Sequence, residues 1–216
     1  MTHRETRGKG LRWTADAAQR RHGDSFTLTL GEGLSPYELL RRVGAEDRHI
    51  VPLTRGAAYE LLLREEDDHI SDLDFLDWED ETAVARLTGA GFLPAPPVTI
   101  VRAGSVPGWA YALEEFHCRT GRDLAALSER GRAFCVHRDA KGCSSVGHAR
   151  RGVVVTSFEP GLPHLTKGVP AEVALGFVHD GDEPGDVAFL RFLEDELGLH
   201  IPWEETEAEL PSAALA

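Results

Sequence analysis

The chain has 216 residues and a formal net charge of −13 at pH 7, and 42% of its residues are hydrophobic. A chain of this length can bury a sizeable core without disulfides or metals. The excess of carboxylates disfavours a dedicated nucleic-acid binder, which needs a basic face to neutralise phosphates. Three cysteines cannot form a disulfide framework. Neither a secretory leader nor an apolar run of membrane-spanning length stands out, so we expect a cytoplasmic protein with no membrane segment.

The charge is distributed unevenly along the chain. Residues 1–23 carry six arginine and lysine residues against two acidic ones. We therefore divide the chain into a basic N-terminal arm over 1–24 with a short helix at 11–21, a single domain over 25–210 and a flexible tail over 211–216. The simplest interpretation of the arm is a solvated segment that meets the acidic body.

Caps and periodicity predict the elements of the first half. The stretch SFTLTL at 25–30 alternates and is rich in strand-forming side chains, which predicts a strand. Ser35, Pro36 and Glu38 form a capping box with a proline start, and Gly44 is the stop, so we expect a helix between them. Further helices are predicted at 55–64 and 82–89.

The second half has the pattern of an antiparallel meander. Because its strands are grouped and helices stand before and after them, we predict an α+β fold. Its sheet should be an antiparallel meander of about five strands over residues 98–158, flanked by N- and C-terminal helices. The strands are predicted at 98–103, 109–116, 132–138, 143–149 and 153–158. The helices are predicted at 120–131 with Thr120 as a cap, near 170–178, at 185–197 before Gly198, and after Pro202.

Two cysteines and two histidines occur within AFCVHRDAKGCSSVGH (133–148). Three interpretations are open: a zinc site, a catalytic thiol with its base, or a hairpin. If residue 138 pairs with residue 143, Cys135 and His137 share one face and Cys143 lies on the other. Zinc needs four ligands that converge at about 2.0–2.3 Å. We therefore expect a hairpin without a metal, although a shift of one residue in the register would change the faces.

A catalytic thiol would best be Cys118, which lies beside His117 just ahead of a predicted helix. Adjacent side chains rarely point at each other, however, and no oxyanion-binding loop is recognisable. A small half-buried cysteine is the commoner explanation. We assign no catalytic residue and no cofactor. Enzymatic activity stays open, but the sequence favours a protein without it.

The stretch EEDDHISDLDFLDWEDE (65–81) holds ten carboxylates and no lysine or arginine. It lacks the central glycine and the final glutamate of an EF-hand loop, so it is a poor calcium site. Two interpretations are open. It is a solvated connection whose Phe75 and Trp78 tuck into the core, or a carboxylate surface with aromatic anchors for a basic partner. The second interpretation gives the candidate binding residues Asp72, Asp74, Phe75, Asp77, Trp78, Glu79 and Asp80.

Several short motifs occur in a fixed order along the chain. They are SPYELLRRVGA (35–45), GW (108–109) with a strand that ends in Glu114, LAALSERG (124–131) and FLEDELGLHIPWEE (192–205). In this order they resemble an uncharacterised actinobacterial family, the domain of unknown function numbered 6461. The resemblance covers most of residues 25–210 and implies a bacterial accessory protein inside the cell. It carries no established activity, so no catalytic residue is transferred.

Two classes of function remain. The leading hypothesis is a non-catalytic, acidic interaction protein, either an immunity-like inhibitor or an accessory factor, that presents an acidic and aromatic face to a basic protein partner. The alternative is a small-molecule-binding domain or enzyme with a pocket between the sheet and the C-terminal helices. A flat acidic patch around 65–81 favours the first class, and a deep pocket with converging polar groups favours the second.

Overall fold

The computed structural model describes residue 11 and residues 25–65 and 68–215. The predicted basic arm and its helix therefore lie outside the described residues, apart from Leu11, which is buried in the core.

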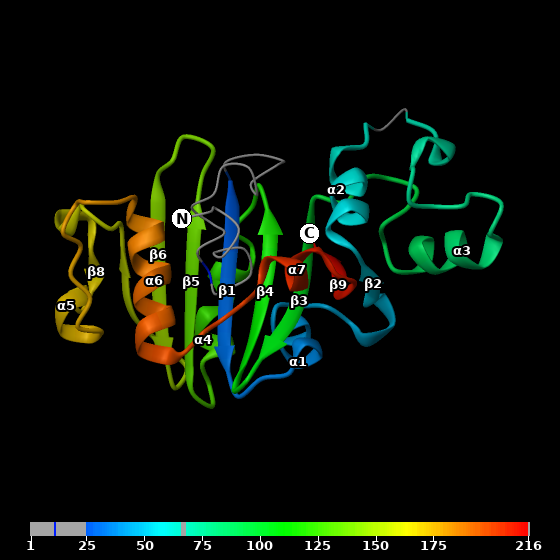
Figure 1. Cartoon of the computed structure of the whole chain (residues 1–216). Helices are drawn as coiled ribbons and strands as arrows, with labels where there is room; N and C mark the ends of the chain where they lie inside the picture. Colours follow the sequence, from blue (N-terminus) through cyan, green and yellow to red (C-terminus); the bar gives the residue numbers. More distant parts are fainter. Residues whose placement is uncertain (1–10, 12–24, 66–67, 216) are drawn as a thin grey trace, which may run out of the picture.

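In the described part of the chain, nine strands form one sheet in the order β2-β9-β3-β4-β1-β5-β6-β7-β8 (Figure 1). Every pair of neighbours is antiparallel. The predicted combination of helices with an antiparallel sheet is confirmed, but the estimate of five strands is too low. The strands are β1 (Phe26–Glu32), β2 (Val51–Leu53), β3 (Thr99–Val106), β4 (Trp109–Glu115), β5 (Arg132–Arg138), β6 (Ser144–Arg150), β7 (Val153–Phe158), β8 (Lys167–Gly168) and β9 (Leu210–Leu215).

The helix ends predicted at Ser35 and Gly198 are confirmed. Ser35 accepts a hydrogen bond from the backbone nitrogen of Glu38 at 3.2 Å, and the Glu38 carboxylate accepts one from the backbone nitrogen of Ser35 at 3.0 Å. Gly198 ends the 13-residue helix α6 (Gly185–Leu197) in the left-handed region, with a φ of 64°. The helices are α1 (Pro36–Arg42), α2 (Arg55–Leu63), α3 (Glu81–Gly89), α4 (Leu124–Leu127), α5 (Ala171–Ala174), α6 (Gly185–Leu197) and α7 (Trp203–Glu207). Short 3-10 helices are η2 (Asp47–His49), η3 (Ile70–Asp72), η4 (Thr120–Asp123) and η5 (Pro163–Leu165).

The strands of residues 98–158 do not form one continuous meander, because β1 lies between β4 and β5. The central residues of β1 are buried, as is expected of a strand covered on both faces. The segment with η4 and α4 carries the chain from β4 across β1 to β5. The edge strands β2 and β8 have three and two residues, which is too short to show a hydrophobic period.

The helix predicted at 120–131 is replaced by η4 and the one-turn helix α4. Thr120 does not cap a helix, because it is fully buried and bonded to Glu114. The backbone nitrogen of Thr120 donates to the Glu114 carboxylate at 3.0 Å, and its hydroxyl donates to the same oxygen.

Residues 211–215 belong to β9 instead of the predicted flexible tail, and residue 216 lies outside the described residues. The sequence LPSAAL has no β-branched or aromatic residue, so its composition did not predict a strand. The strand forms because the small residues Ser212 and Ala213 are fully buried in the sheet. Pro211 lies opposite Pro52 of the edge strand β2, where missing backbone donors are tolerated.

Helices cover both faces of the sheet (Figure 1). On one side, which we call the α6 face, Leu28 and Phe134 pack against Phe189 of α6. On the other side, the α1 face, Cys135 and small side chains pack with Leu40 of α1 and the leucines of α4. Because successive residues of a strand point to opposite faces, each central strand contributes to both cores.

The chain leaves the sheet after β2 and returns at β3, and this excursion forms the α2–α3 lobe (residues 54–65 and 68–98). Figure 1 shows α3 beyond the β2 edge of the sheet and α2 between α3 and the sheet. The lobe has its own apolar cluster, which includes Leu73, Leu76 and Phe92. The two leucines belong to the acidic stretch and tie it to the lobe.

Candidate functional site

The acidic stretch lies on the surface of the α2–α3 lobe. Trp78 is 57% exposed, whereas Leu73 and Leu76 are only 5% and 8% exposed. Phe75 is half-buried and packs against the lobe core. The interpretation that Phe75 and Trp78 both tuck into the core therefore fits Phe75 in part but does not fit Trp78. The other candidate residues are all exposed, and we call them the acidic face: Asp72, Asp74, Asp77, Trp78, Glu79 and Asp80.

Some carboxylates of the acidic face also shape its loop. Asp72 and Asp77 each accept a hydrogen bond from a nearby backbone nitrogen, at 3.1 and 3.0 Å. Asp80 caps α3 through two backbone nitrogens, both at 3.0 Å. Within the described ranges, the side chains of Asp74 and Glu79 make no hydrogen bond or ion pair. These two carboxylates are therefore available to a partner.

The β5–β6 hairpin forms, but its register is shifted by one residue from the prediction. Phe134 pairs with His148, because Asp139 lengthens the loop by accepting a hydrogen bond from the backbone nitrogen of Cys143 at 2.8 Å. Cys143 is consequently exposed in the loop. His148 stacks on Phe134 at the α6 face, while Cys135 lies on the α1 face.

Cys135 and His137 share one face of β5, but His148 lies on the other face and Cys143 lies in the exposed loop, so the four side chains do not converge. Among the described residues, no group of three or more histidine, cysteine, aspartate or glutamate side chains could hold a metal ion. That the purified protein is free of zinc stays a prediction.

A contact that the sequence did not predict joins Cys118 to Cys135. Their sulfur atoms lie 3.7 Å apart, and both thiols are free. The hydrogen bond between them lowers the pKa of Cys118, and the same bond together with burial raises the pKa of Cys135. Burial also raises the pKa of the neighbouring Glu114. Among the residues that the structure describes, no histidine or lysine side chain is bonded to either thiol, so these residues place no base of the kind that a cysteine nucleophile needs beside the pair.

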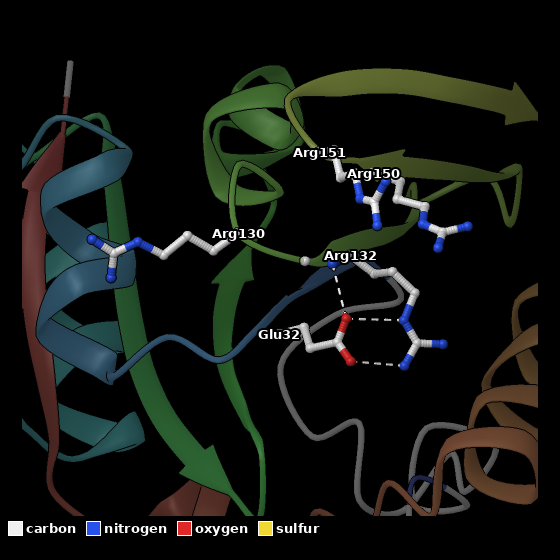
Figure 2. Close-up of a pocket in the computed structure, with 6 residues that line it drawn as sticks. Glu32, Arg130, Arg132, Arg150 and Arg151 are labelled. Carbon is white, nitrogen blue, oxygen red and sulfur yellow. Dashed lines mark hydrogen bonds and ion pairs between the residues drawn. The ribbon is translucent and has the colours of Figure 1, made fainter.

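A cleft of about 340 Å³ opens at one end of the sheet, and four arginines line it (Figure 2). It is built from the end of β1, the start of β5 and the turn between β6 and β7. We call it the arginine cleft, and its lining residues are Glu32, Arg130, Gly131, Arg132, Arg150 and Arg151.

The register of the sheet places the side chains of Glu32, Arg132 and Arg150 next to one another on neighbouring strands. Arg132 pairs directly with Arg150 across β5 and β6. On its other side Arg132 holds Glu32 in a fork, with Nε to Oε2 at 3.0 Å and Nη2 to Oε1 at 2.9 Å. This hydrogen bonding lowers the pKa of Glu32. The Arg132 guanidinium also lies 5.3 Å from the ring centre of Trp109, a cation–π contact.

The arginine cleft was not predicted from the sequence, because its residues come from distant segments that look ordinary one at a time. The available signals were ERGR at 129–132 and ARRG at 149–152. Read locally, the first marks the end of a helix and the second marks a turn.

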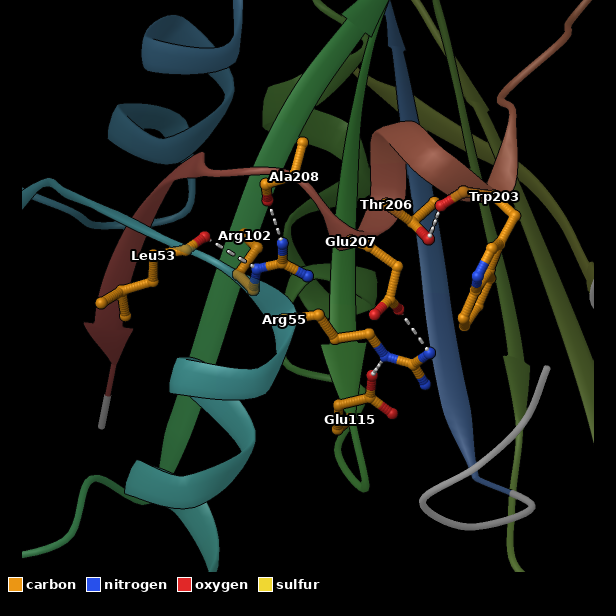
Figure 3. A network of polar contacts seen from close by, with 8 residues as sticks. All are labelled: Leu53, Arg55, Arg102, Glu115, Trp203, Thr206, Glu207 and Ala208. Carbon is orange, nitrogen blue, oxygen red and sulfur yellow. Dashed lines mark hydrogen bonds and ion pairs between the residues drawn. The ribbon is translucent and has the colours of Figure 1, made fainter. Parts of the chain in front are cut away.

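A polar network anchors the α2–α3 lobe to the sheet (Figure 3). Arg55 begins α2 and donates to Glu115 at 2.8 Å and to Glu207 at 3.1 Å. Arg102 is buried, which lowers its pKa to about 10, and it donates to the carbonyl of Ala208 at 2.7 Å. The base of the lobe is thereby fixed to β3, β4 and the C-terminal segment.

A groove of about 290 Å³ lies between the sheet and the α7–β9 segment, where the alternative hypothesis places a ligand. Its lining is mainly alanine, glycine, proline and leucine, with the polar side chains Ser105, Tyr111 and Glu205. Burial raises the pKa of Tyr111 to about 12. Its ring lies against Gly104, where no larger residue fits.

Within the described ranges, no helix combines the length and the apolar character that crossing a bilayer requires. A family model described as "Family of unknown function (DUF6461)" matches residues 8–179, most of the chain. This range includes both the acidic face and the arginine cleft. Comparisons with curated proteins and with solved structures give no match.

Proposed function

This chain belongs to the family of unknown function DUF6461, and for it we propose a non-catalytic role as an acidic interaction protein. In this proposal it is an immunity-like inhibitor or an accessory factor whose acidic face binds a basic surface on a protein partner. We place this binding in the cytoplasm, in keeping with three free thiols.

The exposure of Trp78 is the observation that carries this proposal. Trp78 is 57% exposed although the leucines beside it are buried. A tryptophan side chain offers roughly 150–250 Å² of surface, and burying apolar surface is favourable by roughly 25 cal/mol per Å². A simple connecting loop would gain stability by covering it. A tryptophan left in solvent amid carboxylates instead resembles the aromatic anchors that dominate binding energy at interfaces.

The charges around Trp78 support the same role. Within the described residues, no lysine or arginine pairs with Asp74, Asp77, Glu79 or Asp80. These carboxylates repel one another at neutral pH, and a basic partner would relieve that repulsion. Their attraction would guide the partner over a screening length of about 8 Å at physiological salt and would weaken as salt rises.

The acidic face is also preorganised. Leu73 and Leu76 fix the loop to the lobe core, and Arg55 fixes the start of α2 to the sheet. A surface that is already ordered loses less conformational freedom when it binds. The alternative, a small-molecule pocket beside α7, ranks second because three polar side chains give its groove little with which to recognise a ligand.

The test compares two variants of the acidic face with a matched control. Asp74→Lys with Glu79→Lys reverses two exposed charges that make no local hydrogen bond. Trp78→Ala removes the anchor. Asp195→Lys with Glu196→Lys makes the same charge change at exposed positions of α6. Basic proteins captured from an extract of the source organism are purified, and their binding is followed by stopped flow over a salt series.

The charge-reversal variant should slow association by about tenfold or more at low salt and flatten its salt dependence. Trp78→Ala should mainly speed dissociation, with a loss of about 2 kcal/mol. The α6 control should bind like the wild type. A partner that binds both acidic-face variants at wild-type rates, or that loses as much affinity with the control, would show that the acidic stretch is a solvated connection.

A further inference from the structure

The arginine cleft lies apart from the acidic face and has no part in the function proposed above. Its charge is unusual for this protein, because the whole chain carries a net charge of −13, whereas four arginines and one glutamate give the cleft a net charge of about +3. Positive charge gathered in a concave site raises the local concentration of anions.

Two of the four arginines are in ion pairs, Arg132 with Glu32 and Arg130 with Glu38. Glu32 takes the Nε and Nη2 side of Arg132 only. Among the described residues, the side chains of Arg150 and Arg151 make no hydrogen bond or ion pair. Arg130 extends toward α1 (Figure 2), where it lies 3.7 Å from Glu38. The cleft therefore offers the unpaired guanidinium groups of Arg150 on β6 and Arg151 in the turn, together with the Nη1 atom of Arg132 on β5 that Glu32 leaves open.

Two features of the cleft lower the stability of the fold. Arg132 and Arg150 face each other directly across the strand pair, and like charges in that position are destabilising. Arg151 has a φ of 51°, in the left-handed region that disfavours most side chains other than glycine, asparagine and aspartate. A turn of this kind normally takes asparagine or glycine at that place. Position 151 nevertheless carries an arginine, although this backbone conformation is unfavourable for its side chain.

The backbone is also shaped around the charges. A Cβ atom on Gly131 would lie 2.9 Å from a carboxylate oxygen of Glu32, so a larger residue would shift this carboxylate from its present position. The backbone nitrogen of Arg151 donates to the carbonyl of Gly131 at 3.0 Å and holds the two arginine-bearing loops together. Beneath the cleft, burial and the charges of Arg132 and Arg150 lower the pKa of His148 to about 4, as expected beside concentrated positive charge.

From this arrangement we infer that the arginine cleft binds a small molecule through a phosphate group. Arginine guanidinium groups match the spacing of phosphate oxygens. A tetrahedral phosphate dianion accepts hydrogen bonds from several directions, and the donors of this cleft approach from two strands and a turn. A planar carboxylate suits a single fork, and Glu32 already fills that place. The volume of about 340 Å³ leaves room for a small group attached to the phosphate.

The experiment measures the binding of inorganic phosphate, pyrophosphate and citrate to the full chain by calorimetry in low-salt buffer. Arg150→Ala removes a like-charge contact, and Arg151→Gly relieves the left-handed strain, so both variants should fold as well as the wild type. Thermal melts check this expectation. Arg86→Ala is the matched control, because Arg86 is exposed on α3 in the lobe, away from the cleft.

We expect saturable one-to-one binding of phosphate or pyrophosphate. The affinity should fall about tenfold in Arg150→Ala and in Arg151→Gly and stay unchanged in Arg86→Ala. Tighter binding of pyrophosphate than of phosphate would mean that the site holds two phosphoryl groups, and equal binding would mean that it holds one. The inference is overturned if neither phosphate nor pyrophosphate shows saturable binding, or if citrate binds as tightly as these two anions. It is also overturned if the two cleft variants bind phosphate and pyrophosphate like the wild type.

Discussion

His148 should make the protein acid-sensitive in a way that one substitution removes. Its imidazole is 4% exposed, it stacks on Phe134 with ring centres 4.7 Å apart, and neither ring nitrogen has a partner among the described residues. Burial, followed by the charges of Arg132 and Arg150, lowers its pKa from 6.5 to about 4. The folded protein thus holds this histidine neutral at pH values where the unfolded chain protonates it.

The sign of the effect follows from this difference. Because the folded pKa is below the unfolded one, the contribution of His148 to stability is complete above pH 6.5 and is lost as the pH falls toward 4. A shift of one unit corresponds to about 1.4 kcal/mol, so the full loss is about 3 kcal/mol, and about 2 kcal/mol is lost by pH 5.

The test is His148→Phe, which keeps a flat ring against Phe134 but cannot be protonated. At pH 7.5 the variant should be as stable as the wild type or slightly more stable, because two unpaired buried nitrogens disappear. Urea unfolding followed by circular dichroism at pH 7.5 and pH 5 gives the free energy of unfolding of both proteins, and their shared carboxylates cancel in the difference. The advantage of the variant should grow by about 2 kcal/mol at pH 5. An advantage that changes by less than about 0.5 kcal/mol would refute the reasoning, since surface changes alone give effects of that size.

Three further predictions concern packing, thiol reactivity and metal content. Gly104→Ala would push a methyl group into the ring of Tyr111, so urea unfolding should show a loss of about 1–3 kcal/mol, and an unchanged midpoint would contradict the packing. Under native conditions, iodoacetamide should alkylate the exposed Cys143 first and the buried Cys135 only after denaturation, as peptide mass spectrometry would show, and the reverse order would contradict the burial. Elemental analysis of the purified protein should find no stoichiometric zinc, because the cysteine and histidine side chains of the β5–β6 hairpin do not converge, and one zinc per chain would refute this.

The sequence predicted the parts of the fold that depend on local chemistry. The capping box of Ser35 and Glu38 begins α1, and Gly198 ends α6, because a cap or a left-handed residue acts on its own turn. The order of the strands could not be predicted in this way. No local feature of the stretch Phe26–Glu32 predicts that it lies between β4 and β5, because this position depends on pairing with segments that are distant in the sequence.

The same distinction separates the two candidate sites. The acidic face is contiguous in sequence, so composition alone located it, and the structure added that Trp78 lies outside and Phe75 partly inside the core. The arginine cleft exists only through pairing of β5 with β6, which brings Arg132 opposite Arg150. The predicted hairpin register was wrong by one residue because the loop bond of Asp139 was not recognised. A site that depends on register therefore could not be found before the register was known.

The most direct test of the acidic interaction role replaces Trp78 with the photo-reactive residue benzoylphenylalanine and identifies what crosslinks to it in the source organism. Val173, 74% exposed on the short helix α5 at the opposite edge of the sheet (Figure 1), receives the same residue as a control. We predict that a basic protein crosslinks at position 78 and not at position 173, and that Asp74→Lys with Glu79→Lys abolishes the adduct. An absence of any adduct at position 78, or the same adducts at both positions, would contradict the proposed function.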